Sequence, residues 1–308
     1  MWKEAIFKPQ LCDRAGHPFR LRGYRSIPGG WVSGAISELE KGNEMWQGSE
    51  FQGRVRDLFS TTGVETGILE MKLRQFLKKH SIPKEAIVMD AGCADGRVTH
   101  LLLNAGMQRI VSTDLDQGNV SRMINSLDPD QRTKVLAIVD DFNNLPISDT
   151  TIDVLFAAGL LAELPDFQTA LRSALRTLKP GGLLFYFDPV LEHALIYSLV
   201  RRDLDEFLRI AKTSTRARMW DQKDRRYHVY LAAELERQFQ ANPEVEIILR
   251  DGINLLPSLI FGGILQEETV SPERKQELRD AIQSLSDKNL QVYRQVIYVC
   301  RKKGRRSD

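Results

Sequence analysis

The pattern of hydrophobic and polar positions between about residues 84 and 188 switches repeatedly between two periods. Short apolar runs such as 86–90 (AIVMD) and 151–159 (TIDVLFAAG) are typical of buried strands. Residues 97–106 (RVTHLLLNAG) instead show helical spacing and end in glycine. Further helices are expected at 67–80, 119–127 and 166–178. The expected strands are 86–90, 109–114, 134–141, 151–159, 183–188, 244–250 and 292–301.

Strands that alternate with helices predict a parallel sheet covered by helices. We therefore expect an α/β, Rossmann-like fold with a seven-stranded, mostly parallel sheet and helices on both faces. Residues 67–308 are assigned to this domain and residues 1–66 to an N-terminal extension or cap. Residues 189–241 are expected to be mainly helical, because the apolar positions from 196 to 211 form one stripe at helical spacing.

Composition narrows the class of protein. The chain has 308 residues and a formal net charge of +2, which does not indicate a nucleic-acid binder. Its first residues lack the apolar core of a signal peptide, and no apolar run approaches the roughly 20 residues of a membrane helix. The three cysteines, Cys12, Cys93 and Cys300, suit neither a disulfide framework nor a zinc site. We expect a cytoplasmic protein without a metal site.

Acidic residues stand at the ends of three expected strands, namely Asp90, Asp114 and Asp141. Parallel sheets bind ligands at the carboxyl edge, where these residues would meet. Asp90 opens a glycine-rich turn that runs to Gly96 and leads into a helix. The turn reads D-x-G-x-x-x-G rather than the dinucleotide pattern G-x-G-x-x-G. A carboxylate at this place repels a pyrophosphate and attracts a cationic amino acid group.

Four segments in this order resemble the motifs of class I S-adenosylmethionine-dependent methyltransferases. They cover about a third of the chain and read VMDAGCADGRVTHLL, VSTDLDQGNV, VDDFNNLPISDTTIDVLFAAGLLAELPD and LRTLKPGGLLFYFDP. The resemblance implies S-adenosyl-L-methionine as cofactor and S-adenosyl-L-homocysteine as product. It also implies that Asp90, Gly92 and Gly96 surround the methionine and ribose end of the cofactor. Asp114 would bind the ribose hydroxyls, with Leu115 beside the adenine.

The remaining cofactor residues follow from the same resemblance. Asp141 would meet the adenine amino group and Phe142 would flank the ring. Ala158 and Gly159 would bring backbone close to the methionine portion. Ala94 stands where the family motif has a glycine. Since an alanine disfavours a positive φ, we expect a turn that avoids one here.

The base that would assist methyl transfer is less well defined by the sequence. Many family members carry a histidine after the fourth strand, whereas this chain has Ala162 and Glu163 there. We therefore name His228 as the first candidate base and His193 as the second. In this family the insertion between strands five and six usually roofs the active site, so residues 189–241 are also the expected lid.

Three functions remain open at this stage. The first is methylation of a small molecule or biosynthetic intermediate at oxygen, nitrogen or carbon. The second is methylation of RNA or of a protein or peptide. The third is a cofactor-binding protein that has lost catalysis, a reading favoured by Ala94 and the missing histidine. The uncharged segment 253–265 is expected to line an apolar acceptor pocket, to pack in the core or to contact a partner subunit in a homodimer.

Overall fold

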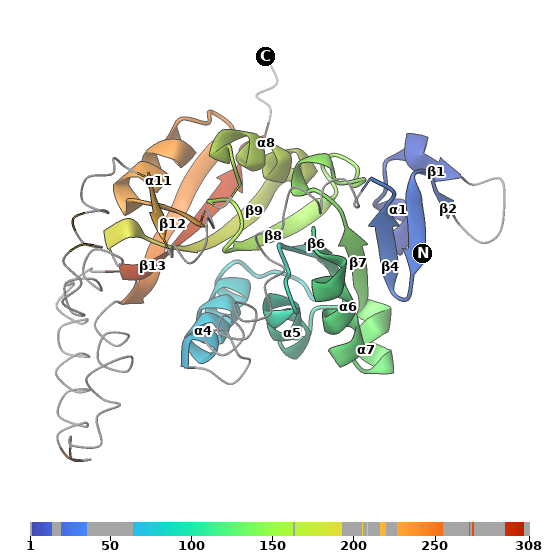
Figure 1. Cartoon of the computed structure of the whole chain (residues 1–308), viewed down its shortest axis with the longest axis horizontal. Coiled ribbons are helices and arrows are strands. Elements are labelled where there is room, and N and C mark those ends of the chain that lie inside the picture. Colours follow the sequence, from blue (N-terminus) through green and yellow to red (C-terminus); the bar gives the residue numbers. More distant parts are fainter. Residues whose placement is uncertain are drawn as a thin grey trace.

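The computed structural model describes residues 2–13, 20–35, 64–162, 164–192, 216–219, 227–254 and 293–304, with single positions at 205, 208, 271 and 273. This part of the chain is built on one twisted sheet with helices on both faces (Figure 1). The expected α/β, Rossmann-like class is confirmed. Within the described ranges, no helix has the length and apolarity needed to span a bilayer.

The sheet contains all seven strands that the sequence predicts. From one edge to the other the strands are β12 (Val245–Asn254), β13 (Tyr293–Lys302), β9 (Leu178–Pro189), β8 (Ile152–Ala158), β5 (Ile87–Ala91), β6 (Arg109–Asp114), β7 (Val135–Val139), β4 (Gly30–Ser33) and β3 (Tyr24–Ile27). The strands from β4 to β9 run parallel, and β13 lies antiparallel between β9 and β12. The carboxyl ends of β5 to β9 therefore share one edge of the sheet.

The sheet has nine strands instead of the expected seven, because an N-terminal hairpin extends it. β4 pairs in parallel with β7, with Gly30 opposite Ala137, and β3 returns antiparallel to β4. Without this hairpin β7 would leave a row of unpaired backbone groups at the edge. A Cβ on Gly30 would lie 1.9 Å from the Ala137 carbonyl oxygen, so this strand pair needs a glycine.

The helices form two layers, each over its own apolar cluster. α4 (Val64–Lys79), α5 (Arg97–Asn104), α6 (Gln117–Ser126) and α7 (Pro129–Lys134) lie on one face, and α8 (Phe167–Thr177) and α11 (Ala232–Gln240) on the other (Figure 1). Leu73 of α4, Leu102 of α5 and Met123 of α6 are fully buried in the first cluster. Leu171 of α8 and Phe239 of α11 are fully buried in the second. The helical spacing read from the sequence thus marks the faces that meet the sheet.

The segment between β9 and β12 differs from the expected helical lid. Its described part holds β10 (Arg216–Met219) and β11 (Tyr227–Tyr230), an antiparallel pair, followed by α11. Three of the four residues of β11 are aromatic or β-branched, and such residues favour strands when a partner strand is present. The apolar stripe 196–211 lies outside the described residues, apart from single positions, and so does the segment 255–265.

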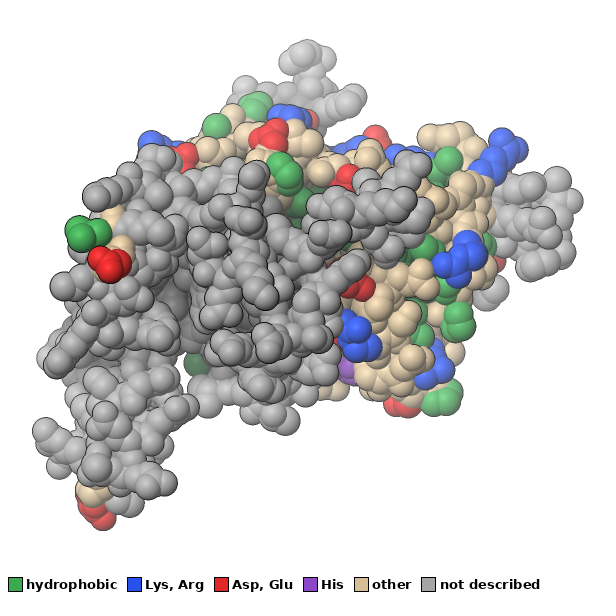
Figure 2. Space-filling model, in the orientation of Figure 1, with side chains coloured by type: hydrophobic (Ala, Val, Ile, Leu, Met, Phe, Trp, Pro, Cys, Tyr) green, Lys and Arg blue, Asp and Glu red, His purple; other side chains and the backbone are tan. Residues whose placement is uncertain are grey.

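The N-terminal residues add a few short elements beside the hairpin. They are α1 (Trp2–Ala5), the 3-10 helix η1 (Pro9–Leu11) and the two-residue strands β1 (Cys12–Asp13) and β2 (Arg20–Leu21). On the face shown in Figure 2, basic and acidic side chains of the described residues are interspersed. This distribution agrees with the small net charge of the chain.

Candidate functional site

Asp90 lies at the carboxyl end of β5, with its side chain beneath the turn that follows. Its Oδ2 accepts a hydrogen bond from the Thr99 hydroxyl at 2.7 Å, and Thr99 Oγ1 lies 2.7 Å from Ser112 Oγ. All three side chains are buried. Burial raises the pKa of Asp90 to about 6, although the hydrogen bonds from Thr99 oppose the shift. This network joins α5 to β5 and β6 and thereby holds the turn in place.

The turn from Asp90 to Gly96 brings three residues into positive φ. They are Gly92 at 72°, Ala94 at 48° and Gly96 at 98°. The expectation that Ala94 would avoid a positive φ is therefore wrong. The physical reason lies in Asp114, whose Oδ2 accepts the Ala94 amide at 2.8 Å. This charge-assisted hydrogen bond offsets a left-handed conformation that costs an alanine roughly 1–2 kcal/mol.

Replacement of Ala94 by glycine should therefore stabilise the protein by about 1 kcal/mol, because glycine adopts the left-handed region without the Cβ penalty. Urea unfolding followed by circular dichroism measures the change in the free energy of unfolding. Ala105→Gly is the matched control, since Ala105 has a φ of −78° and gains nothing from the substitution. A stability of Ala94→Gly equal to or below that of the wild type would contradict the strained turn.

Asp114 ends β6 and is held by three N–H donors. Its Oδ1 accepts the Asp116 amide at 2.9 Å and the Asn119 side-chain amide at 3.4 Å, while Oδ2 takes the bond from Ala94. Burial raises the pKa of Asp114, and the hydrogen bonds act in the opposite direction. Because a carboxylate has about four acceptor positions, this arrangement leaves one of them for a ligand hydroxyl. Leu115, the next residue, is half-buried.

The end of β7 presents two adjacent acids, of which the sequence indicated only Asp141. Asp141 caps the 3-10 helix η3 (Phe142–Asn144), its Oδ1 accepting the Asn143 amide at 3.0 Å, and Phe142 is buried. The acid that sequence reasoning missed is Asp140. It is buried and accepts hydrogen bonds from the Asp141 amide at 2.9 Å and from the Tyr24 hydroxyl.

Tyr24 belongs to β3, so the N-terminal hairpin contacts this edge directly. Burial, followed by its hydrogen bond to Asp140, raises the pKa of the Tyr24 phenol. Arg25 of the same strand donates to the Gln117 side chain at the start of α6, at 3.1 Å. The double acid in VDDF was a visible signal for Asp140, but its partner Tyr24 is 116 residues away in the chain.

The end of β8 lies against the turn from Asp90 to Gly96. Gly159 has a φ of 78°, and its amide donates to the Phe187 carbonyl at 2.9 Å. Ala158 and Gly159 are partly exposed, as the expected backbone contact with a ligand requires. A Cβ on Gly92 would lie 3.1 Å from the Leu160 Cβ. The structure thus brings the residues expected near the methionine portion to one place.

A further acid, Asp188, ends β9 and was not among the expected site residues. The residue is 1% exposed, and within the described part of the chain neither carboxylate oxygen accepts a hydrogen bond of good distance and angle. Burial raises its pKa to about 8, against smaller lowering effects of the Tyr186 hydroxyl and of the Ala162 and Gly159 amides. The signal that indicated Asp90, Asp114 and Asp141, an acid at the end of an apolar strand, also applies to LLFYFD.

The two candidate bases stay predictions. His193 lies outside the described residues, and His228 lies in β11, where the structure describes the backbone but not the side chain. Glu192, which precedes His193, has a structural role. Its carboxylate accepts the Ala232 amide at 3.0 and 3.2 Å and so holds the first turn of α11.

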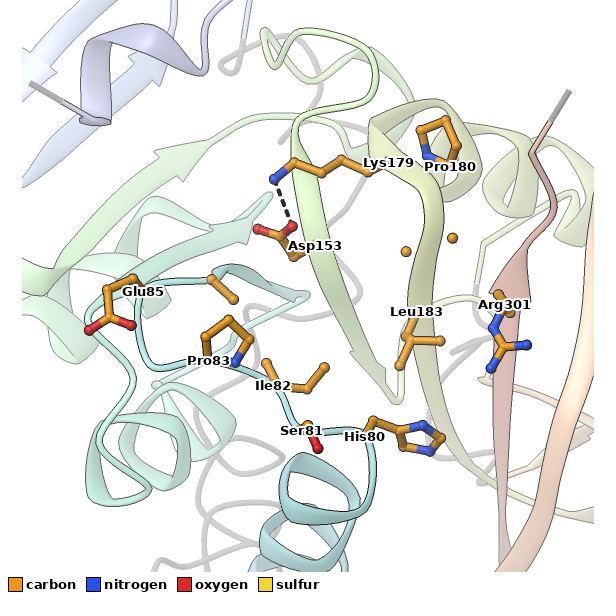
Figure 3. A pocket seen from close by; sticks show the side chains of 13 residues that line it. His80, Ser81, Ile82, Pro83, Glu85, Asp153, Lys179, Pro180, Leu183 and Arg301 are labelled. Carbon is orange, nitrogen blue, oxygen red and sulfur yellow. Dashed lines mark hydrogen bonds and ion pairs between the residues drawn. The ribbon is translucent and has the colours of Figure 1, made fainter.

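A cavity of about 550 Å³ lies at the other end of the sheet (Figure 3). Its lining includes the residues before β5, the first residues of β8 and β9, and Arg301 near the end of the antiparallel β13. At its wall, Lys179 Nζ donates a hydrogen bond to Asp153 Oδ1 at 2.6 Å. Because the amino ends of the parallel strands meet there, this cavity is separate from the edge that carries the acids.

The strand order and the acids at the carboxyl edge define a class I methyltransferase fold, and comparisons with known proteins agree. Residues 89–186 match the family model described as a methyltransferase domain. A crystal structure of a protein from Pyrococcus horikoshii OT3 has a TM-score of 0.53 at 15% identity and covers 83% of this chain and all of that one. Residues 89–186 therefore resemble a methyltransferase domain, and the structural match shows that the fold is shared.

Two curated relatives share part of this region. A malonyl-[acyl-carrier protein] O-methyltransferase of Dechloromonas aromatica (strain RCB) is 31% identical over 98 residues, which are 32% of this chain and 34% of that protein. Another, from Hahella chejuensis (strain KCTC 2396), is 24% identical over 156 residues, 48% of this chain and 52% of its own length. The matches thus span about half of these relatives or less.

Proposed function

We propose that this protein is an S-adenosylmethionine-dependent methyltransferase that transfers a methyl group to a carboxylate oxygen of a small or carrier-bound acid. The observation that carries the cofactor proposal is the group of acids at the carboxyl edge, at the ends of β5, β6 and β7. Asp90 opens, and Asp114 hydrogen-bonds to, a turn in which Ala94, Gly92 and Gly96 adopt positive φ. The edge therefore suits a ligand whose hydroxyl and amino groups donate hydrogen bonds to these carboxylates.

The residues present fit S-adenosylmethionine. When bound, this cofactor supplies an electrophilic methyl group on a positively charged sulfur. The Asp114 carboxylate is oriented by its three N–H donors and has one acceptor position left for a ribose hydroxyl. Asp141, beside the buried Phe142, is placed for the adenine amino group. The carboxylate set also suits a cationic ligand better than a pyrophosphate.

The acceptor is proposed from the names of the two relatives, both of which methylate a malonyl group on an acyl carrier protein. Such an acceptor is a biosynthetic intermediate, the class that the sequence favours. An RNA or peptide acceptor and a protein that only binds the cofactor are the alternatives. An assay of methyl transfer separates these three functions. Transfer to malonyl-acyl carrier protein supports the proposed function, transfer to RNA or peptide supports the first alternative, and transfer to none of them supports a protein that only binds the cofactor.

The cofactor proposal is tested by calorimetric titration with S-adenosylmethionine and with S-adenosylhomocysteine. We expect both to bind, and we expect Asp114→Ala to weaken binding more than tenfold, since a charge-assisted hydrogen bond contributes about 1.5–3 kcal/mol. Asp130→Ala is the control, because Asp130 is exposed in α7 and pairs with Lys134. Thermal unfolding shows whether each variant is folded. A wild type that binds neither compound would refute the proposal.

A further inference from the structure

Asp188 is a buried acid that forms no well-defined hydrogen bond or ion pair that would stabilise the described part of the fold. It lies at the carboxyl end of β9, beside the strand whose end carries Ala158 and Gly159. A Cβ on Gly159 would lie 3.9 Å from Asp188 Oδ1. Gly159 is one of the residues expected to contact the methionine portion of the cofactor. Asp188 is therefore placed close to the position at which an acceptor must meet the cofactor.

Asp188 lacks the well-formed hydrogen bonds that buried acids normally accept. More than nine in ten buried polar groups in proteins are hydrogen-bonded, yet no donor in the described ranges makes a well-formed hydrogen bond to either oxygen of Asp188. The Tyr186 hydroxyl and the Gly159 and Ala162 amides approach it only closely enough for weak interactions that lower its pKa. Asp90 offers an internal comparison, since it is equally buried and accepts a hydrogen bond from Thr99. An unpaired buried acid is costly, and such groups concentrate at functional sites.

The surroundings of Asp188 favour its neutral form. Within the described residues, the Tyr186 hydroxyl on the same strand is the titratable side chain that acts on it, and the loop after β8 acts through the Gly159 and Ala162 amides. Neither a lysine nor an arginine of the described residues contributes to its ionisation. With its pKa raised to about 8, Asp188 keeps its proton at neutral pH and can donate a hydrogen bond.

We propose that Asp188, as the neutral acid, binds the acceptor by donating a hydrogen bond to its carboxylate group. This inference rests on the function proposed above and deepens it, since it assigns an acceptor-binding residue. A neutral acid suits an anionic acceptor for a clear reason: it satisfies one acceptor oxygen without adding a second negative charge. An ionised Asp188 would repel the same acceptor in a site of low dielectric.

The test compares Asp188→Asn with Asp188→Leu, using malonyl-acyl carrier protein as the probe. Its binding to the complex of protein and S-adenosylhomocysteine is measured by calorimetry between pH 6 and pH 9, together with kcat and KM. Asparagine retains an N–H donor and cannot ionise, whereas leucine has no polar group. Glu244→Gln, at an exposed site, is the control.

In the wild type we expect acceptor affinity to fall about tenfold or more as the pH rises past 8. Asp188→Asn should bind within about threefold of the wild type at pH 7 and lose this pH dependence. Asp188→Leu should bind the probe at least tenfold more weakly. All variants should bind S-adenosylhomocysteine within about twofold of the wild type, which keeps this test independent of the cofactor proposal.

Three results would overturn the inference. The first is probe binding by Asp188→Leu equal to that of the wild type. The second is a combination of two observations: Asp188→Asn is inactive, and the rate of the wild type rises as the pH passes 8. Together they would make Asp188 a general base. The third is a wild type that binds S-adenosylhomocysteine but not the probe, which would exclude this acceptor while the cofactor proposal stands.

Discussion

Asp188→Asn should stabilise the ligand-free protein, by an amount that grows as the pH rises from about 4 to about 8. The pKa of Asp188 is about 8 in the folded protein, compared with 3.8 for an unperturbed aspartate. Between these values the unfolded chain binds fewer protons than the folded one at this position, so stability falls as the pH rises. Below about pH 4 Asp188 causes no pH-dependent loss of stability, because it is protonated in both states. Above about pH 8 it is ionised in both states, so its destabilising effect grows no further.

The size of this effect follows from the same linkage. Each unit of pKa difference corresponds to about 1.4 kcal/mol, which gives the wild type a penalty of about 4 kcal/mol at pH 7. Asparagine has nearly the same shape and cannot ionise, so it escapes the pH-dependent part of the penalty. Its amide is still buried without a partner, and this part of the cost does not change with pH.

Urea unfolding at pH 5, 7 and 8 measures the difference between Asp188→Asn and the wild type. Burial also raises the pKa values of Asp90, Asp114 and Asp140. These acids are present in both proteins, so their contributions to the pH dependence of stability cancel in the difference. Glu244→Gln, at an exposed site, serves again as the control. A constant difference for Asp188→Asn would show that Asp188 is ionised or solvated in the folded protein.

Gly96→Ala should destabilise the protein by about 2–5 kcal/mol. Gly96 has a φ of 98°, where an alanine is strained by roughly 1–2 kcal/mol. The new Cβ would also lie 2.3 Å from the Met123 Cγ, and overpacking of this kind costs about 1–3 kcal/mol. Because Gly96 is the N-cap residue of α5 and ends the glycine-rich turn, relief of the clash should distort the turn and weaken binding of S-adenosylhomocysteine as well.

Gly67→Ala is the matched control for this substitution. Gly67 lies within α4, and a Cβ there would meet no atom within 4 Å. Helix propensity predicts that this variant is more stable by about 0.5–1 kcal/mol. In the double variant of Gly96→Ala with Met123→Ala, the clashing Cγ is absent, so the combined loss should be smaller than the sum of the single losses. Additive losses would contradict the clash between α5 and α6.

The seven predicted strands and most helices could be inferred from sequence because they depend on local periodicity. Residues 97–106 show the point, since their helical spacing and terminal glycine led to α5 within two residues of its end. Three strand-end acids, Asp90, Asp114 and Asp141, were recognised for the same reason: a polar residue that closes an apolar run is visible in one short segment.

Features that join distant segments were not visible in this way. The hairpin of β3 and β4 was missed because its short strands are stabilised by the free edge of β7, more than 100 residues away. The bond between Tyr24 and Asp140 depends on that docking. Ala94 adopts a positive φ because Asp114, on another strand, accepts its amide. Local propensity correctly describes the cost of that conformation but not the partner that offsets it.

Asp188 shows the division most clearly. Its place at the end of an apolar strand follows from periodicity, and so does its position on the carboxyl edge of the sheet. Its lack of a well-formed hydrogen bond in the described ranges follows only from how β8, β9 and the loop after β8 come together. Burial and the distances to neighbouring groups set its ionisation, and both are properties of packed segments rather than of any one of them.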